Sequence, residues 1–202
     1  MVRACVFDLG GVIFDFDFGP FYERVLPHCR AGVSKESLAR LVEARHEKLE
    51  RGLARFSAYY ERYAEEVGLR IGVEEFTVMW SDIFTEKPET TALLRRLKDV
   101  RLFMLSNTDE AHIAWVRERF GEVMGLFEKC FFSYELGAIK PAPEVFRGVE
   151  NVTGLAPEAH LLIDDIEANV QAALNAGWQG VRFRSAAELE KSLRSAGVEI
   201  TN

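Results

Sequence analysis

Short apolar runs, each about the length of one β-strand, constrain the fold of this chain most strongly. They cover residues 3–8, 101–105, 129–133, 160–164 and 179–183. Between them lie stretches with helical spacing, over residues 88–98, 109–120, 143–153 and 166–176. Strands that alternate with helices of this length are typical of βαβ units and a parallel sheet. We therefore expect an α/β protein with a Rossmann-like parallel sheet flanked by helices.

About 80 mostly helical residues separate the first expected strand from the rest of the sheet. Residues 14–18 alternate Phe and Asp, which predicts an extended segment or a small hairpin. Apolar side chains at helical spacing follow, and Gly52 and Gly68 interrupt them. A helical insertion directly after the first strand predicts a cap over the crevice of the sheet. The expected division is a core of residues 1–15 and 88–202 and a helical cap of residues 16–87.

The composition argues against several classes of protein. A formal net charge of -7 gives no sign of a nucleic-acid-binding surface. No run approaches the ~18 apolar residues of a membrane span, and the N-terminus lacks a secretory pattern, so we expect a cytoplasmic protein. Three widely spaced cysteines argue against a zinc site or a disulfide framework. The stripe Tyr59-Tyr60-Tyr63 fits either a cap core or a dimer face, so a monomer and a homodimer both remain open.

Polar groups stand at or beyond the ends of four of the expected strands. In chain order they are Asp8, Ser106 with Asn107, Lys140, and Asp164 with Asp165. Ligands of an open parallel sheet bind outside the carboxyl ends of its strands. We therefore expect these groups, which lie far apart in the sequence, to meet in one crevice and form an active site.

The residue types in this crevice suit a phosphate group and a divalent cation. Asp164 and Asp165 would repel each other unless a cation lay between them, and Mg²⁺ prefers carboxylate and phosphate oxygens. The alternative for this pair is an acidic helix N-terminus that complements the helix dipole. Ser106 and Asn107 precede an expected helix and form either an anion cradle or an ordinary cap. Lys140 would offset phosphoryl charge, although a single lysine is more often merely solvated.

Taken in order, these motifs resemble those of the haloacid dehalogenase-like superfamily. The matching segments are Asp8-Leu9-Gly10-Gly11-Val12, Ser106-Asn107-Thr108, Lys140-Pro141 and Asp164-Asp165. The helical insertion also matches the cap of one large branch, so the resemblance covers nearly the whole chain. It is closest to the sugar-phosphate phosphatase-like members whose first motif begins Asp-Leu-Gly.

The resemblance implies a role for each of these residues. Asp8 would be a nucleophile that forms an aspartyl-phosphate, although on its own it could equally be a turn aspartate. Mg²⁺ would be held by Asp8, the backbone carbonyl of Gly10 and Asp164. Asp165 would act behind these ligands, toward Lys140 or a metal-bound water, and Asn169 would orient Asp165.

One position departs from the family pattern. Most phosphatases of the family carry a second aspartate two positions after the nucleophile, as general acid and base, and this chain has Gly10 there. General acid–base help is worth roughly 10²–10⁴-fold in rate. Either the leaving group needs little protonation, or Asp15, Asp17 or a cap residue substitutes, or turnover has been lost. We favour the first interpretation.

The expected cap offers weaker signals. Glu50-Arg51-Gly52 lies between two expected helices, like the family's specificity loop, so Arg51 or Glu50 could meet the substrate. The alternative is a solvated helix end stopped by a glycine. Arg45 and His46 are candidates of lower grade, and we assign no role to the remaining histidines.

Three hypotheses for the function result. The leading one is a Mg²⁺-dependent hydrolase, a phosphatase acting on a small phosphorylated metabolite such as a sugar phosphate. A 2-haloacid dehalogenase is the second, but the uncompensated Asp164-Asp165 pair would repel a carboxylate substrate. A non-catalytic binding or regulatory module is the third, and only Gly10 supports it.

Overall fold

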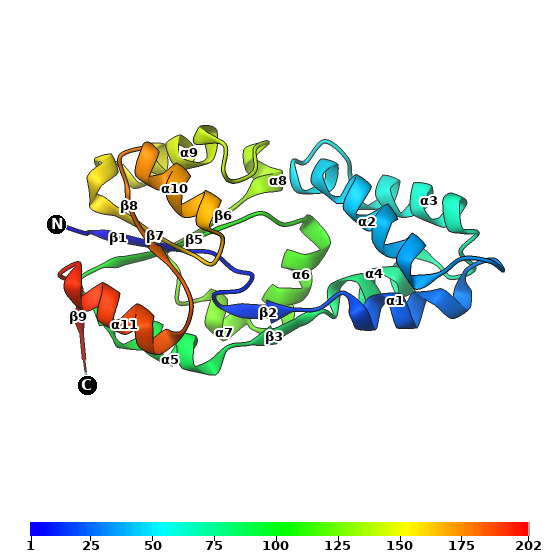
Figure 1. Cartoon of the computed structure of the whole chain (residues 1–202), viewed down its shortest axis with the longest axis horizontal. Coiled ribbons are helices and arrows are strands. Elements are labelled where there is room, and N and C mark those ends of the chain that lie inside the picture. Colours follow the sequence, from blue (N-terminus) through cyan, green and yellow to red (C-terminus); the bar gives the residue numbers. More distant parts are fainter. Residues whose placement is uncertain (202) are drawn as a thin grey trace.

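A five-stranded parallel sheet forms the centre of the computed structural model, which describes residues 1–201 (Figure 1). In spatial order its strands are β6 (Lys129–Phe132), β5 (Arg101–Ser106), β1 (Ala4–Phe7), β7 (His160–Asp164) and β8 (Gln179–Arg182). Every neighbouring pair in this sheet is parallel. The expected Rossmann-like α/β fold is confirmed, and all five expected strands are present.

The central strand β1 is apolar throughout because both faces of the sheet are covered. Cys5 and Phe7 point into a core formed with α5 (Pro88–Arg96), α6 (Glu110–Arg119) and α11 (Ala186–Ser195). Ala4 and Val6 point to the opposite face, which α9 (Pro143–Thr153) and α10 (Glu167–Asn175) cover. Successive side chains of a strand point to opposite faces, so this one short strand belongs to both cores. Two further helices, α7 (Gly121–Met124) and α8 (Ser133–Leu136), flank β6 in the sequence.

The residues between β1 and α5 form a helical group with an apolar core of its own. Its helices are α1 (Gly19–Val25), α2 (Lys35–Glu50), α3 (Phe56–Val67) and α4 (Val73–Ser81), and they lie together at one end of the molecule in Figure 1. Phe21, Tyr63, Phe76 and Trp80 are fully buried in this core. Tyr59 is buried with them, so the tyrosine stripe contributes to the core of the helical group.

A two-stranded antiparallel ribbon leads from the sheet to the helical group. Strand β2 (Phe14–Phe16) pairs with β3 (Phe84–Glu86), with Asp15 opposite Thr85. The extended segment was expected, but a local hairpin is wrong, because its partner lies beyond the whole helical group. Strand β3 is too short to show an alternating pattern, and its residues were expected to belong to the helical insertion. We propose that this ribbon connects core and cap and that the cap comprises residues 16–87.

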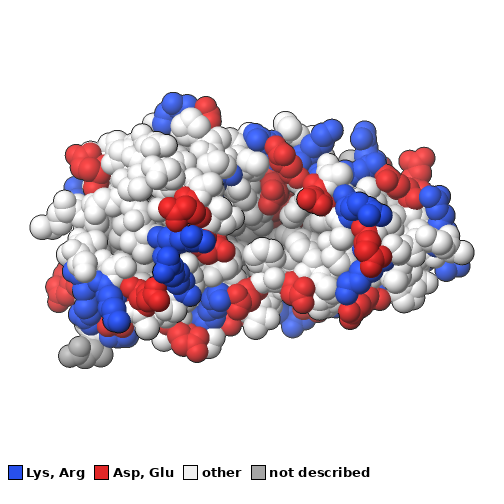
Figure 2. Space-filling view, in the orientation of Figure 1, with Lys and Arg blue, Asp and Glu red and all other residues white. Residues whose placement is uncertain are grey.

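The C-terminal end of the chain lies against the end of α5. Strand β4 (Leu97–Lys98) pairs antiparallel with β9 (Glu199–Ile200), so α5 ends at Arg96 and not at residue 98. In Figure 2, basic and acidic side chains are mixed on the face shown. Within residues 1–201, no helix combines the length and the apolar character that a membrane crossing requires.

Candidate active site

Three charged side chains from distant parts of the chain meet at the carboxyl edge of the sheet. Asp8 follows β1, Asp164 ends β7, and Lys140 lies in the loop before α9. The Nζ atom of Lys140 is 3.0 Å from Oδ1 of Asp8 and 2.6 Å from Oδ2 of Asp164. All three side chains are buried. The structure thus brings together the residues that the strand-end argument selected.

Negative charge exceeds positive charge in this site. Oxygen atoms of Asp8, Asp164 and Asp165 lie within 4.8 Å of one another, and Lys140 is the single cation paired with any of them among the described residues. Burial raises the pKa of Asp8 to about 7; the Lys140 charge opposes this rise and the Asp164 charge adds to it. Burial lowers the pKa of Lys140, but Asp8 and Asp164 outweigh burial and raise it overall. Clustered carboxylates with this excess charge fit a divalent cation that takes oxygen ligands.

Asp165 is held close to the loop that follows β1. A Cβ atom at Gly11 would lie 2.3 Å from Oδ2 of Asp165, and Gly11 has φ of +71°. Only glycine fits at this position, because the backbone is left-handed and the carboxylate fills the space of a side chain. Burial and the neighbouring Asp164 raise the pKa of Asp165. No ion pair joins Asp165 to Lys140 in the described chain, so the structure does not show the first of the two expected roles of Asp165, and the role toward a metal-bound water stays a prediction.

Asn169 contacts a different aspartate from the one expected. Its Nδ2 donates to Oδ1 and Oδ2 of Asp164 at 3.0 and 3.1 Å. The amide of Ile166 also donates to Oδ1 of Asp164, at 2.9 Å. The first turn of α10 therefore folds back over Asp164, whereas Asp165 points toward Gly11. Asn169 orients Asp164, and the expectation that it orients Asp165 is wrong.

Ser106 ends the neighbouring strand β5, and Asn107 follows it. Ser106 is buried at the edge of the site. Asn107 binds the main chain of Lys140: its Nδ2 donates to the Lys140 carbonyl at 3.0 Å, and the Lys140 amide donates to its Oδ1 at 2.8 Å. The peptide bond from Lys140 to Pro141 is cis. Because its amide group is engaged in this way, Asn107 positions Lys140, and the structure gives no support to Asn107 as a direct phosphate ligand through its side chain.

A cavity of about 150 Å³ opens beside this site, between the core and the helical group. It is lined from the core by Leu9, Gly10, Ser106, Asn107, Thr108 and His112, and from the ribbon and helical group by Phe16, Phe18, His46, Glu50, Ile83 and Phe84. Glu50 was one of the two expected specificity residues. The other, Arg51, does not line the cavity, because its Nε pairs with Glu47 at 2.7 Å one turn earlier on α2.

A buried hydrogen-bond cluster behind the cavity was not foreseen. Asp109, the N-cap of α6, accepts the amides of Ala111 and His112 at Oδ1, both at 2.9 Å. Its Oδ2 lies 3.1 Å from Nε1 of Trp80, 3.0 Å from Nδ1 of His112 and 3.3 Å from Nε2 of His46. The cluster ties α2 and α4 to α6. The expected cap was Ser106 or Asn107, whereas Asp109 is the N-cap of α6. No local pattern of the sequence pairs Asp109 with side chains of α2 and α4.

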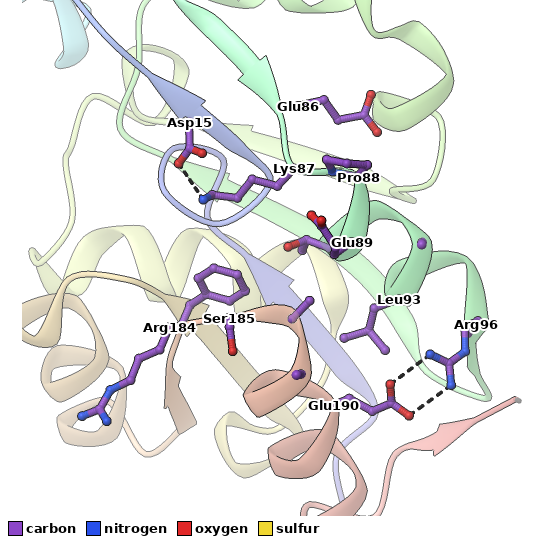
Figure 3. Close-up of a pocket in the computed structure, with 15 residues that line it drawn as sticks. Asp15, Glu86, Lys87, Pro88, Glu89, Leu93, Arg96, Arg184, Ser185 and Glu190 are labelled. Atoms are coloured by element: carbon purple, nitrogen blue, oxygen red, sulfur yellow. Dashed lines mark hydrogen bonds and ion pairs between the residues drawn. The ribbon is translucent and has the colours of Figure 1, made fainter.

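A larger cavity, of about 610 Å³, lies elsewhere, between the ribbon, α5 and α11 (Figure 3). Four of its charged side chains form two ion pairs: Lys87 with Asp15 at 2.6 Å and Arg96 with Glu190 at 2.9 Å. None of the clustered aspartates lines it. The site is therefore assigned by its chemistry and not by the size of the cavity.

Comparisons with known proteins identify relatives of this chain. The family model described as haloacid dehalogenase-like hydrolase matches residues 2–177. A D-ribitol-5-phosphate phosphatase of Bacteroides thetaiotaomicron is 24% identical over 200 residues, which cover 96% of this chain and 97% of that protein.

Solved structures show the same fold at low sequence identity. A HAD family enzyme of Bacteroides thetaiotaomicron, solved in complex with magnesium and inorganic phosphate, superimposes with a TM-score of 0.79 at 24% identity, covering 91% of this chain and 95% of that one. An L-2-haloacid dehalogenase of Xanthobacter autotrophicus gives a TM-score of 0.63 at 22% identity, covering 98% and 84%.

Proposed function

The chain belongs to the haloacid dehalogenase-like hydrolases, and from this premise we propose that it is a Mg²⁺-dependent phosphatase of small phosphomonoesters. The observation that carries the proposal is the buried group of Asp8, Lys140 and Asp164, with Asp165 beside it. The relative named D-ribitol-5-phosphate phosphatase supports a sugar phosphate or a related polyol phosphate as the substrate class.

The proposed metal site consists of Asp8, Asp164 and the backbone carbonyl of Gly10. Bound Mg²⁺ would neutralise phosphoryl charge and orient the phosphate for in-line attack. Asn169 and the Ile166 amide fix the Asp164 carboxylate in one orientation. Asp165, packed against Gly11, adds negative charge next to these ligands.

The chain's own groups account for nucleophilic attack on the phosphoryl group. Oδ1 of Asp8 accepts hydrogen bonds from the Leu9 amide at 2.7 Å and from Lys140, which fixes the plane of the carboxylate. The Asp8 side chain keeps 11% of its surface exposed, so an oxygen can reach a substrate phosphorus and form an aspartyl-phosphate. Lys140 and Ser106 hold phosphoryl oxygens during the transfer, and water then releases phosphate. Preorganised charges of this kind act strongly in a buried site.

The dehalogenase alternative is not favoured. The clustered aspartates would repel a 2-haloacid carboxylate, whereas a phosphomonoester arrives with a cation that compensates both charges. The likeness to the Xanthobacter dehalogenase concerns the fold alone. A non-catalytic module is also disfavoured, because Lys140, Asp164 and Asp165 lie close to Asp8.

Release of phosphate from p-nitrophenyl phosphate, with Mg²⁺ or with a chelator, tests the proposal. We expect turnover with Mg²⁺ and none with the chelator, and no turnover from Asp8→Asn, which keeps the shape of the side chain. A panel of sugar and polyol phosphates then identifies the preferred alkyl substrate. Turnover by a folded Asp8→Asn variant, or equal turnover with chelator, would exclude the proposed mechanism.

A further inference from the structure

When the bond between phosphorus and the alcohol oxygen of a phosphomonoester breaks, an ordinary alcohol departs as an alkoxide unless a proton reaches that oxygen. We propose that His46, on helix α2, donates this proton to the leaving group. This is the second interpretation of Gly10, in which a residue of the helical group substitutes for the missing aspartate, and it replaces the one favoured from the sequence. The inference rests on the proposed phosphatase function and adds to it the group that acts on the alcohol side of the substrate.

The position of His46 places it on the alcohol side. Gly10 and Ser106, next to the attacking Asp8, line one part of the 150 Å³ cavity, and His46 and Glu50 from the helical group line another. An apolar cavity of about this volume in another protein binds benzene, so there is space for a leaving group of roughly six heavy atoms. A substrate whose phosphate binds at Asp8 would direct its alcohol portion into this cavity.

The ring of His46 is oriented for donation. Its Nε2 faces Oδ2 of Asp109 at 3.3 Å, and its Nδ1 has no hydrogen-bond partner within residues 1–201. The side chain keeps 19% of its surface exposed. A buried carboxylate that accepts from one ring nitrogen, with the other nitrogen unpaired among the described residues and the side chain at the wall of a cavity, is the arrangement of an oriented proton donor.

Electrostatics favour the protonated form of this imidazole. Burial lowers the pKa of His46, but the hydrogen bond to Asp109 and the charges of Glu50 and Asp109 outweigh burial and raise it above its usual value. His112, from α6, also faces this cluster. The cluster therefore favours the imidazolium form, which is the form that can donate a proton.

Other polar groups of the cavity are less suited to this role. Both ring nitrogens of His112 are engaged, Nδ1 by Asp109 and Nε2 by the Trp80 carbonyl at 3.1 Å. Glu50 makes no hydrogen bond with a described residue that would fix its carboxyl group. Gly10 offers no side chain, and a Cβ there would lie 2.9 Å from Cε1 of Phe16, so the phenyl ring occupies the space of a longer residue.

The proposed step balances in protons and bonds. Asp8 forms a bond to phosphorus while the bond from phosphorus to the alcohol oxygen breaks, and that oxygen takes the proton of the His46 imidazolium. The products are an aspartyl-phosphate, a neutral alcohol and neutral His46. Water then attacks the aspartyl-phosphate and passes one proton to His46, which restores the imidazolium, the Asp8 carboxylate and free phosphate.

The test compares His46→Gln with the wild type on two leaving groups. An aryl phosphate needs little protonation, and an alkyl phosphate, the best one from the panel, needs much. We expect kcat/KM to fall about 10²-fold or more for the alkyl ester and to change less than about threefold for p-nitrophenyl phosphate. His28→Gln, in the same helical group but outside the cavity, is the matched control and should match the wild type on both esters. Glu50→Gln removes one of the charges that raise the pKa of His46, so its selective loss should be smaller than that of His46→Gln.

Each other outcome overturns one specific statement. Equal losses of His46→Gln on both esters would make His46 a binding residue, and no loss on either would remove it from the reaction. Selective loss in Glu50→Gln alone would transfer the role to Glu50. If the wild type hydrolyses aryl esters but no alkyl esters, the proposed role of His46 as a proton donor is wrong, and the proposed phosphatase function still holds. A wild type inactive on both would overturn the proposed function itself.

Discussion

Replacing Asp109 by Asn would test the energetic role of the buried cluster that joins α2 and α4 to α6. Asn keeps a carbonyl oxygen for the amides of Ala111 and His112, and it is as good an N-cap as Asp. Its NH₂ group, however, would face the Trp80 Nε1 donor that now lies 3.1 Å from Oδ2. A hydrogen bond to a charged group contributes about 1.5–3 kcal/mol, and an unsatisfied buried donor costs about 1–3 kcal/mol. We therefore expect Asp109→Asn to lower the free energy of unfolding by about 3 kcal/mol.

Urea unfolding followed by circular dichroism measures this change, with Asp109→Ala and Trp80→Phe as companions. Asp109→Ala should be worse by about 1 kcal/mol, because the cap is lost as well. In the Trp80→Phe background the penalty of Asp109→Asn should shrink, because the unsatisfied donor is gone. A loss below about 0.5 kcal/mol for Asp109→Asn, the range of ordinary surface changes, would refute the reasoning.

The stability difference between the wild type and Asp109→Asn should depend on pH. Burial raises the pKa of Asp109, but the charges and hydrogen bonds of His112 and His46 outweigh burial and hold it well below its usual range. The Asp109 contribution is therefore present above its unfolded pKa of about 3.9 and is lost as the pH falls further. The raised pKa of His46 gives a contribution that is present below about 6.5 and is lost as the pH rises through its folded pKa. The difference between wild type and Asp109→Asn should be largest between about pH 4 and 6.5.

Three further predictions concern the aspartate site. Lys140→Met leaves buried carboxylates without their partner, so we expect a loss of about 3–5 kcal/mol of stability and partial recovery with Mg²⁺ in thermal denaturation; a variant as stable as wild type without Mg²⁺ would contradict this. Gly11→Ala places a Cβ 2.3 Å from Oδ2 of Asp165 at φ of +71°, and this backbone conformation costs about 1–2 kcal/mol for alanine. The variant should bind Mg²⁺ more weakly in calorimetry. Unchanged affinity would argue against Asp165 near the metal. Asn169→Ala frees Asp164 and should weaken Mg²⁺ binding about 10- to 100-fold, as loss of a residue behind a ligand does, and an unchanged affinity would show that Asp164 needs no such support.

Much of the core could be predicted from the sequence because its signals are local. An apolar run such as Ala4–Phe7 indicates a strand buried on both faces, and polar residues directly after such runs must lie at one edge of a parallel sheet. That reasoning predicts that Asp8 and Asp164 meet at this edge, whereas Lys140 lies farther along the chain, beyond α8. It needs only the parallel topology, and it does not need the strand order.

The rest depends on contacts between segments that local patterns do not encode. Helical spacing shows that one face of α2 is buried, but it does not show that His46 meets Asp109 from α6. The partner of Asn169 was wrong for a similar reason, because Asp164 and Asp165 are adjacent and only the path of the first turn of α10 decides between them. Strand β3, with three residues, is too short for any periodic signal.

The Asp109 cluster also limits how freely this protein's parts could be exchanged. The aspartate site is built from the ends of sheet strands, and the helical group supplies His46, Glu50 and other walls of the cavity, which suggests that a foreign cap could be grafted to change specificity. Yet two of the side-chain donors to Oδ2 of Asp109, on Trp80 and His46, come from the helical group. A chimera whose new cap brings no N–H groups to that oxygen would bury a carboxylate with too few partners, and its domains would separate or misfold. A successful exchange of the cap therefore requires that the new cap also carries these donors or that Asp109 is replaced at the same time.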